Sequence, residues 1–265
     1  MKKLLHPNGK GAVVIIHGAF EHSGRYEWLA TQLQRSGLHV IYGDLPGQGK
    51  SVGPKGHIDT FQQYIDTVAI WISEAEKLHV PVYIIGHSMG GLITIRLLQT
   101  IQPTISGVVL SSPGLGIKSK PPKFLSFISV LLDKVIPRFQ VATKLDPTHS
   151  TRNSVIYDRD LRDPLYLEKV SVRWYHEFER SIEQAFRNIH HYPNVPTLIM
   201  QAGYDLLVNE HEVKHWFDLL PIEEKQYKQW DNLYHEIFNE PERDEVFAYM
   251  IDFINQLNNP LRNGG

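Results

Sequence analysis

Val82-Tyr83-Ile84-Ile85-Gly86-His87-Ser88-Met89-Gly90-Gly91 is the stretch that decides the fold. Its opening residues are apolar and mostly β-branched, which is typical of a strand buried in a parallel sheet. Gly86 to Gly90 then match G-x-S-x-G, the pattern of a sharp turn that exposes a serine between a strand and a helix. Glycine on both sides lets the two backbones pass closely, because it has no Cβ. The stretch therefore predicts a strand, a turn with Ser88 at its apex and a helix, although the motif alone also fits an ordinary structural turn.

Strands and helices alternate on both sides of this stretch. Apolar, β-branched runs predict strands over 12–17, 39–43, 82–85, 107–110, 197–201 and 225–230. Apolar residues at helical spacing predict helices over 24–36, 61–78, 92–98, 210–220 and 241–257. This alternation favours a mostly parallel sheet of about six strands with helices on both faces.

One interval breaks the alternation. Residues 113–196 separate two predicted strands, and this span of about 80 residues far exceeds a crossover with its short connections. We therefore expect a core made of residues 1–112 and 197–265, with a helical lid inserted at 113–196. The lid should contain one helix over 121–137, apolar almost all round, and a pair of helices over 164–188. The first helix is either the core of the lid or a surface that faces a substrate channel or a lipid interface.

Composition excludes several classes of protein. The chain has 265 residues, a formal net charge of −2 and no cysteine. Disulfides, cysteine nucleophiles, thiolate metal sites and iron–sulfur clusters are therefore excluded, and no net field favours nucleic acid. The basic start is interrupted at His6-Pro7 before any signal-peptide core, and no apolar run reaches the ~20 residues of a membrane span. We expect a soluble, cytoplasmic protein, and the sequence leaves its oligomeric state open.

A serine nucleophile needs a base that takes its proton and an acid that orients the base. In folds with this turn the chain order is serine, acid, histidine, each at the carboxyl end of a strand. Among 14 histidines, His235 fits best, because it follows the strand that ends at Trp230 and precedes the last helix. His235 is thus the predicted base for Ser88.

The acid should lie just past an earlier strand. Asp205 follows the strand 197–201, whereas Asp218 falls inside a predicted helix and Asp231 suits a turn. Asp44 also ends a strand, but it comes too early in the chain and fits a turn-forming role. Asp205 is the predicted acid.

Acyl transfer further needs two N–H donors for the negative oxygen that develops on the carbonyl. The residue after the nucleophile, Met89, supplies one, and the loop after an early strand supplies the other. His17-Gly18-Ala19 fits this loop, with the Ala19 N–H as donor, although the same residues also fit an ordinary strand-to-turn junction.

A second motif competes for the chemistry. His211-Glu212-Val213-Lys214-His215 matches H-E-x-x-H, which presents two histidines on one helix face to zinc. A catalytic zinc site needs a third ligand, and a chance match is unsurprising in a chain with 14 histidines. Zinc hydrolysis through His211, Glu212 and His215 is therefore a remote alternative.

Taken together, the motifs resemble the α/β-hydrolase superfamily, and more narrowly its monoacylglycerol lipase and lysophospholipase group, with bacterial phospholipase and carboxylesterase members. The stretches that carry the resemblance span nearly the whole predicted core and are 17–26, 43–49, 86–91, 203–205 and 234–236. The resemblance implies the triad Ser88, Asp205 and His235, with oxyanion donors Ala19 and Met89 and no cofactor.

The resemblance also implies that Glu21 and Arg25 lie near the polar end of the pocket, where a glycerol group would sit. An ion pair away from the substrate is the equal alternative for these two residues. The fold commonly opens with a hairpin, but only 11 residues precede Ala12, so this hairpin should be shortened or absent.

The activity that the resemblance implies is hydrolysis of lipid esters, with transient contact between the lid and a membrane or micelle surface. A strongly apolar lid helix favours lipid esters over peptides as substrates. Short-chain esters, small peptides and thioesters are alternatives on the same triad, because the fold does not choose among them. A non-catalytic binding protein is a further alternative, which the complete set of triad candidates disfavours.

Overall fold

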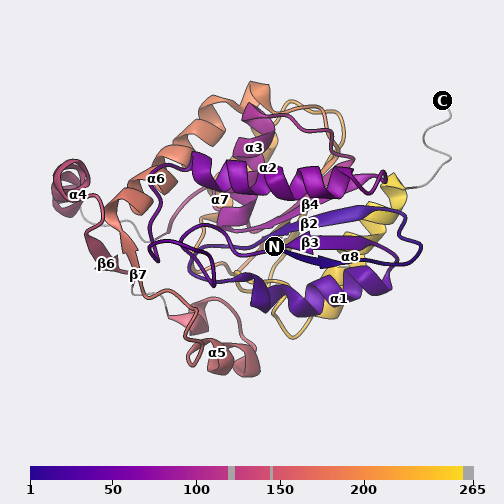
Figure 1. Ribbon diagram of the computed structural model, residues 1–265, viewed down its shortest axis with the longest axis horizontal. Helices are drawn as coiled ribbons and strands as arrows, with labels where there is room; N and C mark the ends of the chain where they lie inside the picture. The colour runs from indigo at the N-terminus through magenta and orange to yellow at the C-terminus, as the bar shows by residue number, and fades with distance from the viewer. Residues whose placement is uncertain (119–122, 144–145, 259–265) are drawn as a thin grey trace.

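A seven-stranded sheet forms the centre of the computed structural model, which describes residues 1–118, 123–143 and 146–258 (Figure 1). The strands are β1 (Lys2–Leu4), β2 (Ala12–Ile16), β3 (His39–Tyr42), β4 (Val82–His87), β5 (Gly107–Ser111), β8 (Thr197–Ala202) and β9 (Lys225–Trp230). They lie in the order β1-β3-β2-β4-β5-β8-β9, and neighbouring strands are parallel except for β1 with β3. The predicted mostly parallel sheet is confirmed.

The strand beyond the expected six is the short β1. It has three residues and pairs antiparallel with β3, with Lys2 opposite Tyr42 and Leu4 opposite Val40. It extends the edge of the sheet at the start of the chain. Within the described residues, β1 is the one strand that precedes β2.

Helices cover both faces of the sheet (Figure 1). They are α1 (Glu27–Arg35), preceded by the short 3-10 helix η1 (Ser23–Tyr26), then α2 (Gln62–Glu76), α3 (Met89–Thr100), α7 (Glu210–Leu219) and α8 (Arg243–Leu257). The period-two alternation along β2 shows how two layers form. Val13 and Ile15 join the apolar cluster of α1 and α8, whereas Val14 and Ile16 join the cluster of α2, α3 and α7.

Residues 113–196 leave the sheet after β5 and return to it at β8. The elements in this insertion are α4 (Lys123–Val135), β6 (Gln140–Ala142), η2 (Pro147–His149), α5 (Ser154–Asp160), β7 (Lys169–Ser171), α6 (Val172–Arg187) and η3 (Ile189–His191). The helix predicted over 121–137 corresponds to α4, although residues 121–122 lie outside the described part of the chain. The division into a core and a lid stays a prediction.

The expected pair of helices over 164–188 is wrong. A single helix, α6, occupies the later part of this range, and the strand β7 precedes it. β7 pairs antiparallel with β6, a contact between separate segments that leaves no mark in local periodicity. Ser171 then begins α6 by accepting a hydrogen bond from the Trp174 N–H at 3.1 Å.

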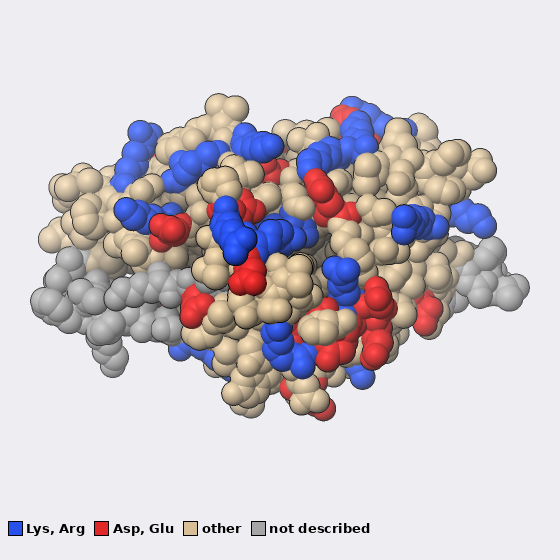
Figure 2. Space-filling view, turned by 90° about the horizontal axis from the view of Figure 1, so that it is seen from below, with Lys and Arg blue, Asp and Glu red and all other residues tan. Residues whose placement is uncertain are grey.

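The surface carries charges of both signs. Figure 2 shows Lys and Arg side chains interspersed with Asp and Glu over one face of the molecule. A mixed surface of this kind does not produce a field of one sign over that face. Among the described helices, none combines the length and the hydropathy that a bilayer span requires.

Candidate active site

Ser88 lies at the carboxyl end of β4, where the chain turns into α3. Its backbone has φ 51° and ψ −119°, a strained conformation for a residue with a side chain. Its N–H donates to the Ser111 carbonyl at 2.9 Å, and its carbonyl accepts the Gly114 N–H at 2.8 Å. A Cβ on Gly90 would lie 2.2 Å from the Ile16 carbonyl oxygen, so only glycine fits there. The predicted strand, turn and helix are confirmed, and Ser88 is half-buried at the turn.

Asp205 and His235 come together beyond the carboxyl ends of β8 and β9. The His235 Nδ1 and Asp205 Oδ2 atoms are 2.7 Å apart, and both side chains are buried. The other Asp205 oxygen accepts hydrogen bonds from the Leu207 and Val208 N–H groups at 2.9 and 2.8 Å. With Nδ1 held by the carboxylate, the neutral imidazole presents Nε2 as its proton acceptor.

The other candidate acids lie elsewhere. Asp218 and Asp231 are both exposed, and among the described residues only Asp205 hydrogen-bonds His235. Asp44 accepts two backbone N–H groups at 2.8 and 2.7 Å, which is the turn-forming role expected of it. Of the four candidate acids, Asp205 is therefore the one in contact with His235, and its catalytic role stays a prediction.

The surroundings of His235 favour its protonated form. Burial opposes the charge, but Asp205, and beyond it Glu236 and Glu21, raise the pKa of His235 above the ordinary value of 6.5. Burial would raise the pKa of Asp205, but the attraction to His235 lowers it. A base in this state is suited to proton transfer near neutral pH.

Activity falls on the acidic side of the pH–activity profile, here called the acid limb. We expect the midpoint of the acid limb to lie above pH 6.5. His235 must be neutral to accept a proton, so activity falls as the pH decreases through its raised pKa. Asp205, whose pKa is lowered, stays ionised throughout this window. The measurement is kcat/KM for a non-ionising ester from about pH 5 to about pH 9. An acid limb at or below the ordinary histidine value contradicts this prediction.

His87 connects the base to the serine turn. It directly precedes Ser88, and its ring lies 4.8 Å from the His235 ring, measured between centroids. Burial, followed by the proximity of His235, lowers the pKa of His87 to about 4, so no like charge faces the base at neutral pH. In the described hydrogen bonds His235 is joined to Asp205 and not to Ser88, so the contact between serine and histidine stays a prediction.

The loop after β2 lies against the nucleophile. A Cβ on Gly18 would lie 3.2 Å from the Ser88 Cβ. Phe20 has a positive φ of 68°, and its carbonyl accepts a backbone N–H of the insertion at 2.8 Å, which fixes the loop. Within the described residues, the N–H groups of Ala19 and Met89 donate to no other backbone group. Both therefore remain the predicted oxyanion donors.

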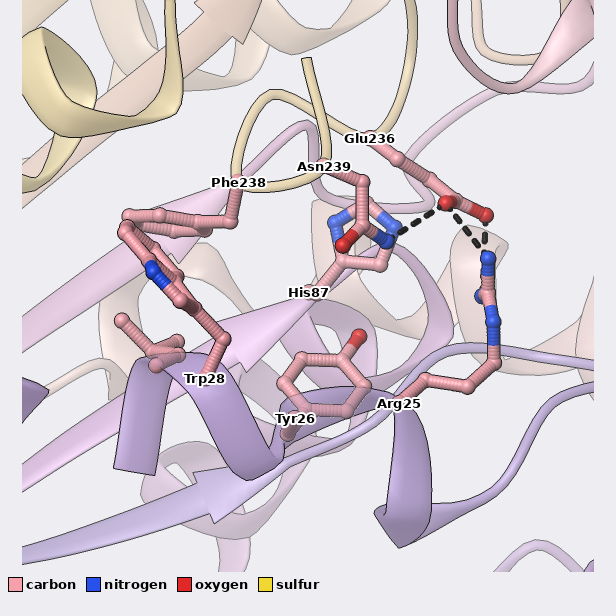
Figure 3. A pocket seen from close by; sticks show the side chains of 8 residues that line it. Arg25, Tyr26, Trp28, His87, Glu236, Phe238 and Asn239 are labelled. Atoms are coloured by element: carbon pink, nitrogen blue, oxygen red, sulfur yellow. Dashed lines mark hydrogen bonds and ion pairs between the residues drawn. The ribbon is translucent and has the colours of Figure 1, made fainter. Parts of the chain in front are cut away.

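Glu21 and Arg25 belong to a buried ionic cluster. The Arg25 guanidinium donates to Glu236 at 3.0 and 2.7 Å (Figure 3), and it pairs with Glu21 and with Asp160 of α5. Burial would raise the pKa of Glu236, but Arg25 lowers it to about 2, so this carboxylate stays charged. The cluster joins the loop after β2, the insertion and the loop that carries His235. The ion-pair alternative is what these contacts show, and substrate contact by Glu21 or Arg25 stays a prediction.

A small cavity adjoins this cluster (Figure 3). Its volume is about 20 Å³, which admits one water molecule. The lining residues are Arg25, Tyr26, Trp28, Leu29, His87, Glu236, Phe238 and Asn239. No role for His87, Glu236 or Asp160 is predicted from the sequence. His87 is next to Ser88 and Glu236 is next to His235 in the sequence, and this adjacency could have indicated both. Asp160 is distant in the sequence and joins the cluster only when the insertion folds.

The H-E-x-x-H motif of α7 is not assembled as a metal site. His211 has a side chain 90% exposed, and His215 stacks on Phe186 with ring centroids 6.0 Å apart. Over residues 1–118, 123–143 and 146–258, no group of three or more His, Asp or Glu side chains is placed to hold a metal ion. The zinc alternative therefore lacks a third ligand in this part of the chain.

A parallel sheet with a strained serine turn, followed by an acid and a histidine at later strand ends, defines an α/β hydrolase. The chain belongs to the family described as serine aminopeptidase, S33, whose model matches residues 7–242. It is 46% identical to phospholipase YtpA of Bacillus subtilis over 245 residues. These residues are 92% of this chain and 95% of that protein.

Two monoacylglycerol lipases are also similar to this chain. Human monoglyceride lipase is 28% identical over 239 residues, which is 87% of this chain and 77% of that protein. The crystal structure of Paleococcus ferrophilus monoacylglycerol lipase has a TM-score of 0.88 at 30% identity, over 97% of this chain and 98% of that one. These findings confirm the predicted α/β-hydrolase fold and the predicted enzyme class, an ester hydrolase.

Proposed function

We propose that this protein hydrolyses carboxylic esters of lipids, of the monoacylglycerol or lysophospholipid type, through Ser88, His235 and Asp205. The observation that carries the proposal is the 2.7 Å contact between His235 and Asp205, buried next to the strained serine turn. The names of the similar proteins, phospholipase and monoacylglycerol lipase, support this choice of ester.

In the proposed mechanism, the Ser88 Oγ attacks the ester carbonyl while His235 Nε2 accepts its proton. Asp205 holds the imidazole and stabilises its cation. The Ala19 and Met89 N–H groups donate to the oxyanion of the tetrahedral intermediate. The alcohol leaves with the proton from His235, an acyl-enzyme remains on Ser88, and water repeats the sequence to release the acid.

A cluster of aromatic side chains lies next to the oxyanion loop. The rings of Phe20 and Trp174 are 5.2 Å apart, and Trp174 stacks on Phe178 at 5.3 Å. A Cβ on Gly114, whose N–H donates to the Ser88 carbonyl, would lie 3.2 Å from the Phe178 ring. Trp174 and Phe178 are buried and Phe20 is partly buried, so the surroundings of the serine turn are apolar, which favours an acyl chain over a charged peptide.

A substrate panel tests the proposed ester. The purified protein is offered monoacylglycerols, lysophospholipids, short p-nitrophenyl esters and aminoacyl amides at matched concentrations. We expect kcat/KM to rise from short to medium acyl chains, because each buried methylene contributes about 0.8 kcal/mol, or up to roughly fourfold. A profile confined to aminoacyl amides would remove the lipid proposal.

Hydrolysis of small peptides is the second candidate, because the matched family is described as serine aminopeptidase. The same nucleophile, base and oxyanion donors act on an amide carbonyl. Short-chain esters and thioesters use them equally. The aminoacyl amide and short-ester arms of the panel separate hydrolysis of peptides and of short-chain esters from lipid hydrolysis.

We further infer that α4 and the segment after it contact the lipid aggregate that supplies substrate. Their exposed apolar side chains, here called the α4 patch, are 45 to 69% exposed and belong to Val130, Leu131, Val135, Ile136 and Phe139. Figure 1 shows α4 at the end of the molecule away from the sheet. Exposed basic residues, Lys134 and Arg138, lie within the same segment. Exposed apolar and basic side chains in one surface segment are typical of attachment to a membrane or micelle surface.

Leu131→Glu is expected to lower hydrolysis of monoacylglycerol in vesicles or micelles by about tenfold, because a buried charge opposes insertion of the α4 patch. Hydrolysis of a dissolved short ester should not change. Ile70→Glu is the matched control, since Ile70 is 61% exposed on α2 and Leu131 is 60% exposed. An equal loss in both variants, or a loss on the dissolved ester, argues against docking through this patch.

A further inference from the structure

A short strap leads from β5 into the insertion and lies alongside the loop of the proposed catalytic acid. The strap comprises residues 116–118, and the acid loop comprises residues 205–210. The backbone N–H of Lys118 donates to a carbonyl of the acid loop at 3.0 Å, and Ile117 forms an antiparallel bridge with Val208. The start of the insertion is therefore joined directly to the segment that carries Asp205.

The side chain of Lys118 contacts the backbone of Asp205. Its Nζ donates a hydrogen bond to the Asp205 backbone carbonyl at 2.6 Å. The same Nζ lies 2.7 Å from the Glu210 carboxylate, at the start of α7. Lys118 thus joins the first and last residues of the acid loop, while the fully buried Asp205 side chain contacts His235 on its other side.

We propose that Lys118 is a positioning residue for Asp205, which rests on the triad proposed above. The ammonium group donates a hydrogen bond to the Asp205 carbonyl, and its charge pairs with the Glu210 carboxylate. Without this group, the acid loop keeps its backbone contacts but loses the bond at the residue that orients the base. A displacement of about 1 Å in a catalytic constellation costs up to about a hundredfold in rate.

Three roles for Lys118 predict different pH profiles. The charged and titratable groups that face His235 are Asp205, Glu236, Glu21 and His87. If Lys118 positions Asp205, its removal weakens the carboxylate contact, so the pKa of His235 falls and the acid limb moves to lower pH. If Lys118 acts only as a cation, its removal moves the acid limb to higher pH. If it only anchors the insertion, stability or KM changes and the limb stays in place.

The test uses the full chain with Lys118→Met, which keeps most of the side-chain length and removes its donors. The parameters kcat and KM and the pH profile are measured on a dissolved p-nitrophenyl ester. The His235 Nδ1 proton is followed in the downfield region of the proton NMR spectrum. We expect kcat to fall about tenfold or more, with KM changed less than about twofold. The acid limb should move to lower pH and the proton resonance should shift upfield or broaden. Lys118→Arg should restore most of the rate, because a guanidinium keeps a donor for the Asp205 carbonyl and a positive charge for Glu210.

Lys214→Met is the matched control, because Lys214 pairs with Asp218 on the exposed side of α7 at 2.5 Å and lies outside the acid loop. It should leave kcat, the acid limb and the resonance unchanged. A Lys118→Met protein with wild-type values of all three overturns the inference, and so does an acid limb that stays in place or moves to higher pH. Failure of the proposed function appears separately, as a wild-type protein without ester hydrolysis or fluorophosphonate labelling. The NMR resonance still tests the alignment of His235 and Asp205 in that case.

Discussion

Ser88→Ala is expected to abolish labelling by a fluorophosphonate and to lower kcat for ester hydrolysis by about 10⁴ to 10⁶. The strained turn places this one hydroxyl half-buried at the carboxyl edge of the sheet. The neighbouring serines, Ser111 and Ser112, are fully buried at the end of β5 and do not replace it. The activity that remains is what oxyanion donors and binding provide without a nucleophile.

Ser106→Ala is the matched control for this variant. Ser106 is half-buried, as Ser88 is, but it lies at the amino end of β5, away from the turn. It should keep both labelling and rate, with unfolding temperatures of the two variants compared to the wild type. Labelling of the Ser88→Ala protein at the wild-type rate would refute the assignment of the nucleophile.

Asp205→Asn is expected to lower kcat by about 10⁴ while leaving the fold intact. The amide keeps the size of the side chain, and its oxygen can still accept the Leu207 and Val208 N–H groups that now bind the carboxylate. Its NH₂ group then faces His235 Nδ1 and favours the tautomer that carries its proton on Nε2. That tautomer cannot accept a proton from Ser88, and the variant also lacks the negative charge that stabilises the imidazolium.

Asp231→Asn separates this effect from the loss of any nearby carboxylate. Asp231 is exposed, follows β9 and accepts a hydrogen bond from Gln229 at 3.1 Å. Its replacement should change kcat by less than about twofold. Comparable activity of Asp205→Asn and the wild type, or a large loss in Asp231→Asn, would assign the acid elsewhere. Single-turnover kinetics with each variant show whether the lost step is acylation.

Much of the candidate site is predictable from the chain because its parts lie at defined points along it. Parallel strands place their carboxyl ends at one edge of the sheet, so residues just past β4, β8 and β9 must meet there. Ser88, Asp205 and His235 occupy those three points. For the same reason Asp218, which lies inside α7, does not contact His235.

The environment of the site was less predictable. Glu21 and Arg25 were expected either near the substrate or in an ion pair, and the choice depended on where Asp160 and Glu236 fold. The insertion was harder still, because β6 and β7 stabilise each other across a long separation in the sequence. The sequence predicts a pair of helices there, and the structure has the strand β7 followed by one helix.

By itself, the sequence determined the α/β architecture, the serine turn and the candidate acid and base, because these depend on short-range periodicity and on glycine at points of close backbone approach. Only the tertiary structure decided that Arg25 enters a buried cluster and that Lys118 reaches the Asp205 carbonyl. It also decided that one helix, α6, follows a strand in the insertion. Each of these features requires two segments that are distant in the chain to meet, and the energy of such a contact depends on geometry that residue types alone do not specify.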